Sequence, residues 1–206
     1  MFINGGNYHQ YCSDETFYGL NLAKYSGGAF RMNGTDVVCA SYNWSAGAID
    51  VLSGSFTAND LVDNAITGAF YNNTGGTINL TNSGSGLYVD LNGEIHNFGG
   101  VYNITGSVSY WPYTNDAVIE MTDGIIDFKT CGIYVSSTAS YDLDYNVTGG
   151  VIRTSAYFSA NRTGFNPTAG TIELYGTSDS YINQSNGSTF YDVNVNNQQM
   201  TMPVVS

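Results

Sequence analysis

The amino-acid sequence predicts an all-β protein folded as a right-handed, single-stranded parallel β-helix, or β-solenoid. Three observations predict this class. A glycine-marked segment recurs along the chain, the residues after each glycine alternate between apolar and polar, and no segment shows sustained 3.6-residue periodicity. One coil of a solenoid is one turn of the chain, and its strands pair with those of the neighbouring coils. We therefore expect one β-solenoid domain over residues 1–206, without a long helix.

The clearest copy of the repeat is residues 75–81, which read Gly-Gly-Thr-Ile-Asn-Leu-Thr. Further copies lie at residues 99–104, 124–128, 149–153 and 170–174, and weaker ones start at Gly28, Gly47 and Gly68. The marker glycines of the clear copies, which recur at a nearly constant step, are Gly76, Gly100, Gly124, Gly150 and Gly170. A period of this length, built from short strands, predicts about seven or eight coils of about 20–26 residues.

Successive side chains of a strand point to opposite faces, so Ile78 and Leu80 are expected inside the solenoid and Asn79 outside. The isoleucines expected to lie in the core close to Ile78 are Ile104, Ile126, Ile152 and Ile172. A second strand is expected half a coil later, at residues 87–91, 117–121, 132–135 and 141–145. Residues 59–65 are compatible with one short helical turn.

Two other architectures compete with the solenoid. A βαβ fold is excluded because nothing between the strands has a helical pattern. A sandwich built from hairpins is the serious rival, but the Asn-Gly pairs that favour tight hairpin turns, at residues 33–34, 92–93 and 186–187, are scattered. A regular step of about 24 residues is also hard to obtain from hairpins.

The expected organisation is a first irregular coil over residues 1–26, repeating coils over 27–187, and a last coil with the start of a further strand over 188–206. Residues 16–22 resemble residues 189–195, near the other end of the chain. At the predicted period the two segments are about seven coils apart. The similarity predicts that the chain begins and ends on the same kind of coil and is one unit of a longer solenoid with exposed ends.

Composition excludes several classes of partner. Only 11% of residues are charged and the net charge is −12, whereas 17 Tyr and 10 Phe supply apolar area for a core. Five basic side chains are too few for a phosphate-binding surface, so neither nucleic acid nor an anionic membrane is an expected partner. Residues 1–11 have neither the basic nor the apolar part of a signal peptide, and no run is long enough for an apolar membrane span.

Several predicted strands carry an acidic residue between two apolar ones, as at Asp50, Asp90, Glu120, Asp127, Glu173 and Asp192. Stacked in one column, such carboxylates would repel one another or share a cation. We expect a solvated face that discourages pairing with other sheets, and no metal or cofactor site. Polysaccharide lyases and hydrolases need clustered carboxylates with a basic partner. Asp142 and Asp144, shortly before Arg153, approach this pattern only weakly, so we expect no catalysis. His96 is expected to be a surface residue rather than a catalytic base.

The aromatic residues Tyr110, Trp111 and Tyr113 form the densest aromatic cluster in the chain. They form a candidate carbohydrate-binding site, since aromatic rings stack on the apolar faces of sugars. The alternative, which we favour, is that this loop folds back and buries its rings on the solenoid. Cys12 and Cys39 are separated by close to one predicted coil, so they are a candidate disulfide; buried thiols are the alternative.

Residues 75–80, 149–154 and above all 188–197, Ser-Thr-Phe-Tyr-Asp-Val-Asn-Val-Asn-Asn, resemble β-solenoid repeat regions of very large secreted bacterial surface proteins. The resemblance covers most of residues 27–206 and is one of style rather than of a diagnostic motif. It implies a parallel β-helix, a location outside the cell or on its surface, and a structural or adhesive role. It supplies no catalytic residue.

Our first functional hypothesis is therefore a non-catalytic structural or adhesive module of a longer surface protein. The second is a β-helix that binds or degrades carbohydrate, and the third is a subunit of a fibre or appendage. The expected partners are further solenoid coils or other copies of the chain, associated end to end, with glycans as an additional partner.

Overall fold

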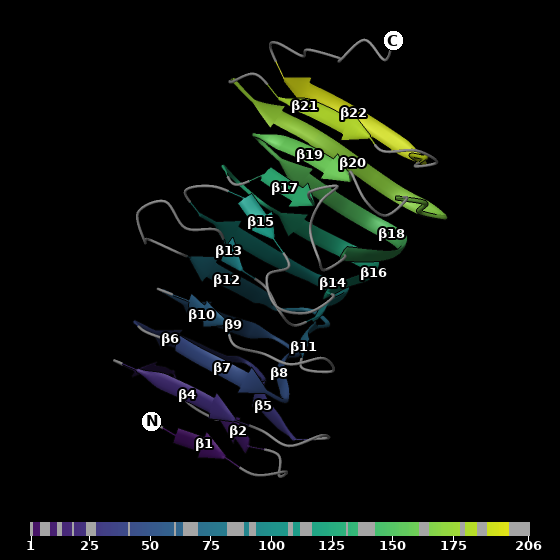
Figure 1. The fold of residues 1–206 in the computed structure, drawn as a ribbon. Helices are drawn as coiled ribbons and strands as arrows, with labels where there is room; N and C mark the ends of the chain where they lie inside the picture. The colour runs from purple at the N-terminus through teal and green to yellow at the C-terminus, as the bar shows by residue number, and fades with distance from the viewer. Residues whose placement is uncertain are drawn as a thin grey trace.

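The structure is a computed structural model. It describes residues 2–4, 9–11, 14–17, 19–23, 28–40, 42–59, 61–63, 70–81, 89–90, 94–106, 109–111, 117–130, 132–135, 143–160, 165–177, 180–184 and 189–197. Within these ranges the regular elements are all β-strands, and the strand pairings are parallel. The strands stack as a β-solenoid, with β1 at one end and β22 at the other (Figure 1). The predicted fold class is confirmed, and the hand of the coil stays a prediction.

The strands form three sheets. The four-stranded sheet contains β1 (Phe2–Asn4), β4 (Leu20–Ala23), β7 (Tyr42–Ala46) and β10 (Leu61–Asp63). The five-stranded sheet contains β13 (Val89–Asp90), β15 (Ser109–Trp111), β17 (Gly132–Val135), β19 (Tyr157–Ala160) and β21 (Tyr181–Gln184). The 13-stranded sheet contains β2 (His9–Tyr11), β3 (Glu15–Phe17), β5 (Ala29–Met32), β6 (Thr35–Cys39), β8 (Ala48–Val51), β9 (Gly54–Ala58), β11 (Phe70–Asn73), β12 (Thr77–Thr81), β14 (Glu94–Thr105), β16 (Ala117–Asp127), β18 (Leu143–Thr154), β20 (Ala169–Gly176) and β22 (Asp192–Asn197).

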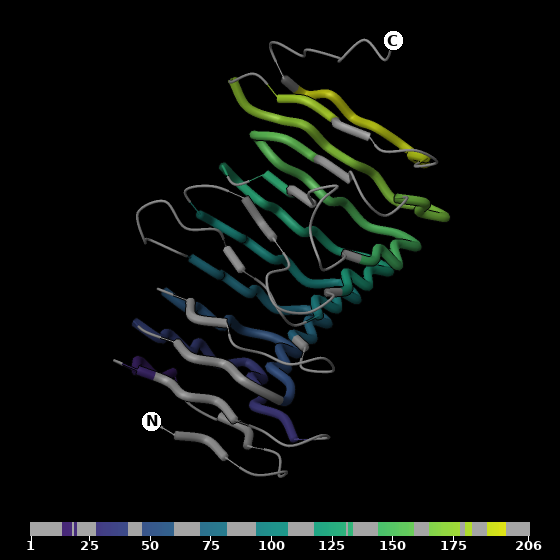
Figure 2. The backbone as a smooth tube through the Cα atoms, viewed as in Figure 1, coloured from purple at the N-terminus to yellow at the C-terminus, as the bar shows by residue number. Residues whose placement is uncertain are grey.

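The largest sheet has two arms that meet at a bend. One row of strands, β2, β5, β8 and β11, leads to the first part of β14, and the other, β3, β6, β9 and β12, leads to its second part. From β14 to β20 one strand crosses the bend in each coil, whereas β22 pairs only with the part of β20 that follows the bend. We call the row from β3 to β12, with its continuation to β22, the second arm. Figure 2 shows the bends stacked one on another along the solenoid.

The two halves of the chain build their coils differently. Up to β12, a coil has one strand in the four-stranded sheet and two in the 13-stranded sheet. From β13 to β22, about five turns alternate between the five-stranded sheet and a longer strand of the 13-stranded sheet. Because the two halves are built from different kinds of coil, the predicted number of seven or eight coils is only approximate. Among the residues that the structure describes, no helix is long and apolar enough to cross a membrane.

The register confirms the glycine period. We call residues that lie opposite one another in successive coils a column. One core column contains Ile78, Tyr102, Ile126, Ile152 and Ile172, each at the same distance after its marker glycine. All five are buried, as is Ile104. Ile104 lies in the core as expected, in the neighbouring column, opposite Leu80 and two residues further along the strand.

Glycine is needed at the bend because the preceding coil occupies the space of a side chain. A Cβ added to Gly100 would lie 2.0 Å from the Oδ1 atom of Asn73, and one added to Gly76 would lie 2.4 Å from a methyl carbon of Val51. At Gly150 the nearest atom would be the terminal carbon of Met121, at 2.3 Å. A side chain at the bend of one coil thus packs against the glycine of the next.

Three smaller expectations are corrected. Residues 16–22 and 189–195 are not equivalent, since Leu20–Ala23 lies in the four-stranded sheet and Asp192–Asn197 in the 13-stranded one. Residues 61–63 form a strand rather than part of a helical turn. Residues 117–121 are no separate second strand, because they are the first part of β16, which crosses the bend and continues to Asp127.

Candidate functional site

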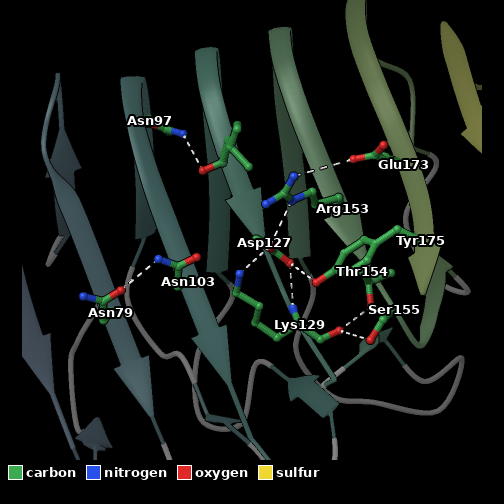
Figure 3. Close-up of polar contacts among 11 residues, drawn as sticks. Asn79, Asn97, Asn103, Asp127, Lys129, Arg153, Thr154, Ser155, Glu173 and Tyr175 are labelled. Atoms are coloured by element: carbon green, nitrogen blue, oxygen red, sulfur yellow. Dashed lines mark hydrogen bonds and ion pairs between the residues drawn. The ribbon is translucent and has the colours of Figure 1, made fainter. Parts of the chain in front are cut away.

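The outer face of the second arm carries one continuous column of polar residues, which we call the polar ladder (Figure 3). It begins in the early coils and ends on β22. In order, its members are Thr57, Asn79, Asn103, Asp127, Arg153, Glu173 and Asn194. Each is one residue away from the core column of Ile78, so it points to the opposite face of its strand. The ladder is the richest collection of functional groups on the described residues.

The first part of the ladder is uncharged. Asn79 donates from Nδ2 to the hydroxyl of Thr57 at 3.0 Å, and Asn103 donates from Nδ2 to Oδ1 of Asn79 at 2.8 Å. Stacked amides suit this position because parallel strands bring equivalent side chains about 4.8 Å apart. Each amide can then donate to one neighbour and accept from the other. These bonds tie each coil to the one before it.

The second part of the ladder is charged and centres on Asp127. The Oδ2 atom of Asp127 lies 2.9 Å from Nε of Arg153 and 2.7 Å from Nζ of Lys129. Its Oδ1 atom accepts hydrogen bonds from the Tyr175 hydroxyl at 2.7 Å and from the backbone N–H of Lys129 at 2.9 Å. Arg153 also lies 3.8 Å from Oε2 of Glu173. The Asp127 side chain is 1% exposed, so these contacts replace its water.

Asp127 is placed by the local backbone as well as by its partners. Lys129 has a positive φ of 44°, which folds the chain back so that its N–H and its ammonium group both reach Asp127. The carbonyl oxygen of Lys129 then accepts hydrogen bonds from the N–H and the hydroxyl of Ser155, at 2.8 and 2.9 Å. The guanidinium of Arg153 lies 5.5 Å from the centre of the Tyr175 ring. Residues of three successive coils therefore meet at one carboxylate.

These contacts set the charge state of the cluster. Burial by itself raises the pKa of Asp127, but the hydrogen bonds from Lys129 and Tyr175 and the charge of Arg153 outweigh it, so the pKa lies below its ordinary value. Burial, the hydrogen bond to Asp127 and its negative charge raise the pKa of Tyr175. At neutral pH, Asp127 is a carboxylate and Tyr175 a neutral phenol. Both carboxylate oxygens are taken up in contacts within the protein, which leaves this group poorly suited to proton transfer.

A second polar column runs along the first arm, which is the row of β2, β5, β8 and β11 with the first parts of the longer strands that follow. Arg31 and Asp50 form an ion pair at 2.5 Å, and Asn72 donates to the other oxygen of Asp50 at 3.0 Å. Further along the same column, His96 lies 2.8 Å from Glu94 and 3.8 Å from Glu120. His96 is half-buried among these acids rather than fully exposed. Here too the polar side chains contact one another, between strands for Arg31, Asp50 and Asn72 and also within β14 for His96 and Glu94.

Two buried asparagines hold the bend itself. Asn73 accepts a hydrogen bond from the N–H of Gly76 at 3.0 Å and donates to the carbonyl of Val101 in the next coil at 3.1 Å. Asn97 does the same one coil later, with Gly100 at 3.0 Å and Ile125 at 3.2 Å. Both side chains satisfy backbone groups that the bend would otherwise leave unpaired.

The acidic residues of the predicted strands do not follow one another directly in either polar column. In the polar ladder, Arg153 lies between Asp127 and Glu173, and on the first arm Asn72 and His96 lie between Asp50 and Glu120. Within the described part of the chain, no cluster of three or more His, Cys, Asp or Glu residues could hold a metal ion. The acidic residues are thus spaced by partners of opposite charge or by amides.

The predicted carbohydrate site falls largely outside what the structure describes. Ser109–Trp111 forms β15 in the five-stranded sheet, so Tyr110 and Trp111 lie on a strand, while Tyr113 lies outside the described residues. Cys12 also lies outside them, so the disulfide with Cys39 stays a prediction. The Cys39 thiol is buried, and burial raises its pKa to about 12. Asp142 is outside the described ranges, and Asp144 is exposed on β18.

One hollow near the end of the second arm has a volume of about 330 Å³. It is lined by Val151, Thr171, Glu173, Asp192, Val193 and Asn194. The Thr171 hydroxyl lies 3.4 Å from Oδ2 of Asp192, and Nδ2 of Asn194 lies 3.4 Å from Oε1 of Glu173. Its lining is mostly polar, and its acids contact side chains of the adjacent coils: Asp192 contacts Thr171, and Glu173 contacts Asn194 and Arg153.

No family model, curated protein or solved structure matches this chain.

The Asp127 cluster is the feature that our sequence reasoning missed. We looked for charges that are close in sequence, but Asp127 and Arg153 are 26 residues apart and meet because they occupy the same place in successive coils. A signal was present. Asn79, Asn103, Asp127, Arg153 and Glu173 each lie three residues after the glycine that marks their coil. Aligning the repeats on these glycines gives the central part of the ladder directly.

Proposed function

We propose that this chain is a non-catalytic structural module of a surface-exposed β-solenoid, with adhesion as the role of the assembled protein. One observation carries the proposal: the polar side chains that are best placed for chemistry bond to the neighbouring coils instead. Asp127 is the main example, since its four contacts come from the residues of three coils. A catalytic carboxylate needs at least one oxygen available to a substrate.

The polar ladder supports a role in resisting forces that pull the coils apart. Its bonds run along the axis of the solenoid, so a force that separates coils must break them together with the parallel strand pairs. Hydrogen bonds to charged groups contribute more to stability than those between neutral groups, about 1.5–3 kcal/mol each. The charged contacts of Asp127 therefore reinforce the middle of the stack.

A location outside the cell is part of the same proposal. It is supported by the low proportion of charged residues, 11%, and by a composition in which Asn, Ser, Thr and Tyr supply most of the polar side chains. It is supported further by the resemblance of residues 188–197 to repeats of secreted surface proteins. The fibre subunit is a variant of this proposal that differs only in the assembly.

Antibody labelling tests the location. An antibody raised against the purified chain should label intact cells of the source organism, and brief treatment of those cells with an added protease should remove the label. A matched sample of permeabilised cells shows the total amount of antigen. Label that is confined to permeabilised cells would contradict the proposal.

A second assay tests the absence of catalysis. The purified chain is incubated with neutral glycans and with uronate polymers, with and without calcium, and the products are followed by mass spectrometry. We expect no cleavage. Cleavage that is lost in Asp127→Asn or Asp144→Asn, with the thermal melting temperature retained, would contradict the structural role and favour a polysaccharide-degrading solenoid.

A further inference from the structure

We propose that the outer edge of β22 binds one strand of another solenoid coil, parallel and in register, with aliphatic side chains over Val193 and Val195 and an amide over Asn194. The inference rests on the proposed function and adds the chemistry of the partner. That partner is a coil from outside residues 1–206 rather than a second copy of this chain.

The first observation is a break in burial along the core columns. Val193 lies opposite Ile172, which is 3% exposed, and Val195 lies opposite Leu174, which is buried. Val193 itself is 37% exposed and Val195 40%. Every earlier member of the Val193 column from Val37 to Ile172 is covered on both sides by neighbouring coils. At β22 the same columns continue without their cover.

The second observation is the continuity of the strand pairing. Among the described strands, β22 pairs only with β20, so one row of its backbone N–H and C=O groups lacks a strand partner there. Such an edge is a template for a further strand. The β20–β22 pairing is an established parallel interface six residues long, and a strand added to β22 would repeat it. The geometry of the new contact is therefore set by the ladder already present.

The polar ladder specifies the residue between the two aliphatic ones. Asn194 ends the ladder, exposed, with its Nδ2 atom 3.4 Å from Glu173. In the uncharged part of the ladder, Asn103 stacks on Asn79 and donates from Nδ2 to its Oδ1 atom. An amide placed over Asn194 would continue this chain of bonds. A basic residue would also fit beside Asp192, whose neighbourhood contains Glu173 and no basic side chain among the residues that line the hollow.

A second copy of the chain does not fit this edge. Followed through the register, the Val193 column begins at Glu15 on β3. Head-to-tail stacking in register would therefore place the Glu15 side chain over the apolar Val193 and remove a carboxylate from water against an aliphatic surface, which costs free energy. It would also bring together two chains that each carry a net charge of −12. End-to-end association of identical copies is thus opposed by both contacts and charge.

The chain itself supplies a probe with the required chemistry. Residues 75–82, Gly-Gly-Thr-Ile-Asn-Leu-Thr-Asn, form the strand whose Ile78, Asn79 and Leu80 occupy the columns of Val193, Asn194 and Val195. A synthetic peptide of this sequence is added to the isotope-labelled protein up to about 2 mM, a concentration that detects binding with a Kd of about 1 mM. Backbone amide resonances are recorded by NMR. The control peptide carries Asp in place of the Ile and the Leu.

We expect the first peptide, and not the control, to shift the amide resonances of Val193, Asn194 and Val195. A spin label on the N-terminus of the peptide should broaden Asp192 more than Asn197, as a parallel arrangement requires. Val193→Asp should weaken binding at least tenfold. Phe98→Asp is the matched control, because Phe98 is also 37% exposed but lies at the bend, and this change should leave binding intact. Thermal melting confirms that both variants are folded.

Several outcomes would overturn the inference. They are no shift on β22 at the highest concentration, equal binding of the control peptide, or equal binding by the Val193→Asp variant. Concentration-dependent self-association that is lost in Val193→Asp and strengthened in Glu15→Gln would replace the foreign coil by a second copy. The outcome is separable from that of the proposed function. If the peptide does not bind but the antibody labels intact cells, only this inference falls. If the peptide binds but the antibody does not label intact cells, only the surface location falls.

Discussion

The side chain of Asn73 occupies the space that the absent side chain of Gly100 leaves free in the next coil. A Cβ at Gly100 would lie 2.0 Å from Oδ1 and 2.2 Å from Cγ of Asn73. In return, Asn73 bonds to the Gly76 N–H within its own coil and to the Val101 carbonyl in the following one. The glycine that marks each repeat in the sequence is therefore the contact point of two coils, and the size of one residue limits the size of the other.

Replacement of Gly100 by alanine should destabilise the protein by about 1–3 kcal/mol, the range typical of overpacking a well-packed interior. Asn73 is held by hydrogen bonds at the bend and cannot move away without losing them. The free energy of unfolding is measured in urea. The control is the double variant Asn73→Ala/Gly100→Ala, which removes the clash, so its destabilisation should be smaller than the sum of the two single effects. Additive effects would show that the two residues do not touch.

Removal of the Asp127 carboxylate should be among the most destabilising single changes in the chain. Asp127→Ala leaves Arg153 and Lys129 without their shared partner, and because both cations are partly exposed the cost should be that of charged hydrogen bonds, about 1.5–3 kcal/mol. The control is Asp123→Ala, four residues earlier on the same strand, because Asp123 is exposed. It should cost less than about 1 kcal/mol. Equal effects of the two changes on urea unfolding would contradict the geometry of the cluster.

The same cluster should make stability depend on acid pH. The pKa of Asp127 is lower in the folded protein than in the unfolded chain, where it is about 3.9. Its contribution is therefore fully present above the unfolded pKa and is lost as the pH falls through the folded pKa. Urea unfolding midpoints recorded from pH 7 to pH 2 should fall at the acid end. Asp127→Asn should show a shallower fall than the parent protein, and a parallel fall in both would count against the assigned pKa direction.

The thiol of Cys39 should be unreactive in the folded protein. Burial raises its pKa to about 12, so almost none of it is thiolate at pH 8. Alkylation with iodoacetamide at this pH, followed by peptide mass spectrometry, should leave Cys39 unmodified until urea is added. The same raised pKa stabilises the fold below the unfolded pKa of the thiol, and this contribution is lost as the pH rises. Rapid alkylation without urea would contradict the burial of Cys39 in the core.

The fold could be predicted from the sequence because a solenoid repeats its local signals. Glycines at a nearly constant step mark the bends, and alternation after each of them marks a strand. Residue type alone does not give the columns, since Ile104 belongs to the column of Leu80 rather than to that of Ile78. Counted from the glycine, Tyr102 takes the place of Ile78, and this tyrosine fits in the core because its hydroxyl lies within hydrogen-bond distance of the carbonyls of Tyr71 and His96, at 3.1 and 2.9 Å, and can donate to either.

The candidate site was less predictable because its contacts cross coils. The pair of Asp127 and Arg153 follows from the glycine alignment, but the bond from Tyr175 spans 48 residues and two coil steps. Nothing in the local pattern indicates that a tyrosine two coils away turns back to Asp127. The side chain of Lys129 reaches the same carboxylate because the backbone at Lys129 adopts a positive φ. The sequence does not predict this turn, since the residue is not a glycine.

The parallel solenoid and its register are tested most directly by whether Thr77 and Val101 lie side by side. Both point to the outer face and are paired in register across β12 and β14, one coil step apart. Adjacent parallel strands bring Cα atoms to about 4.8 Å, which suits a disulfide. In the variant Thr77→Cys/Val101→Cys, mild oxidation followed by peptide mass spectrometry should give a 77–101 disulfide and a higher melting temperature. Thr77→Cys/Thr105→Cys, displaced by four residues, should not cross-link. Cross-linking of the displaced pair, or of neither, would contradict the parallel solenoid and its glycine-set register.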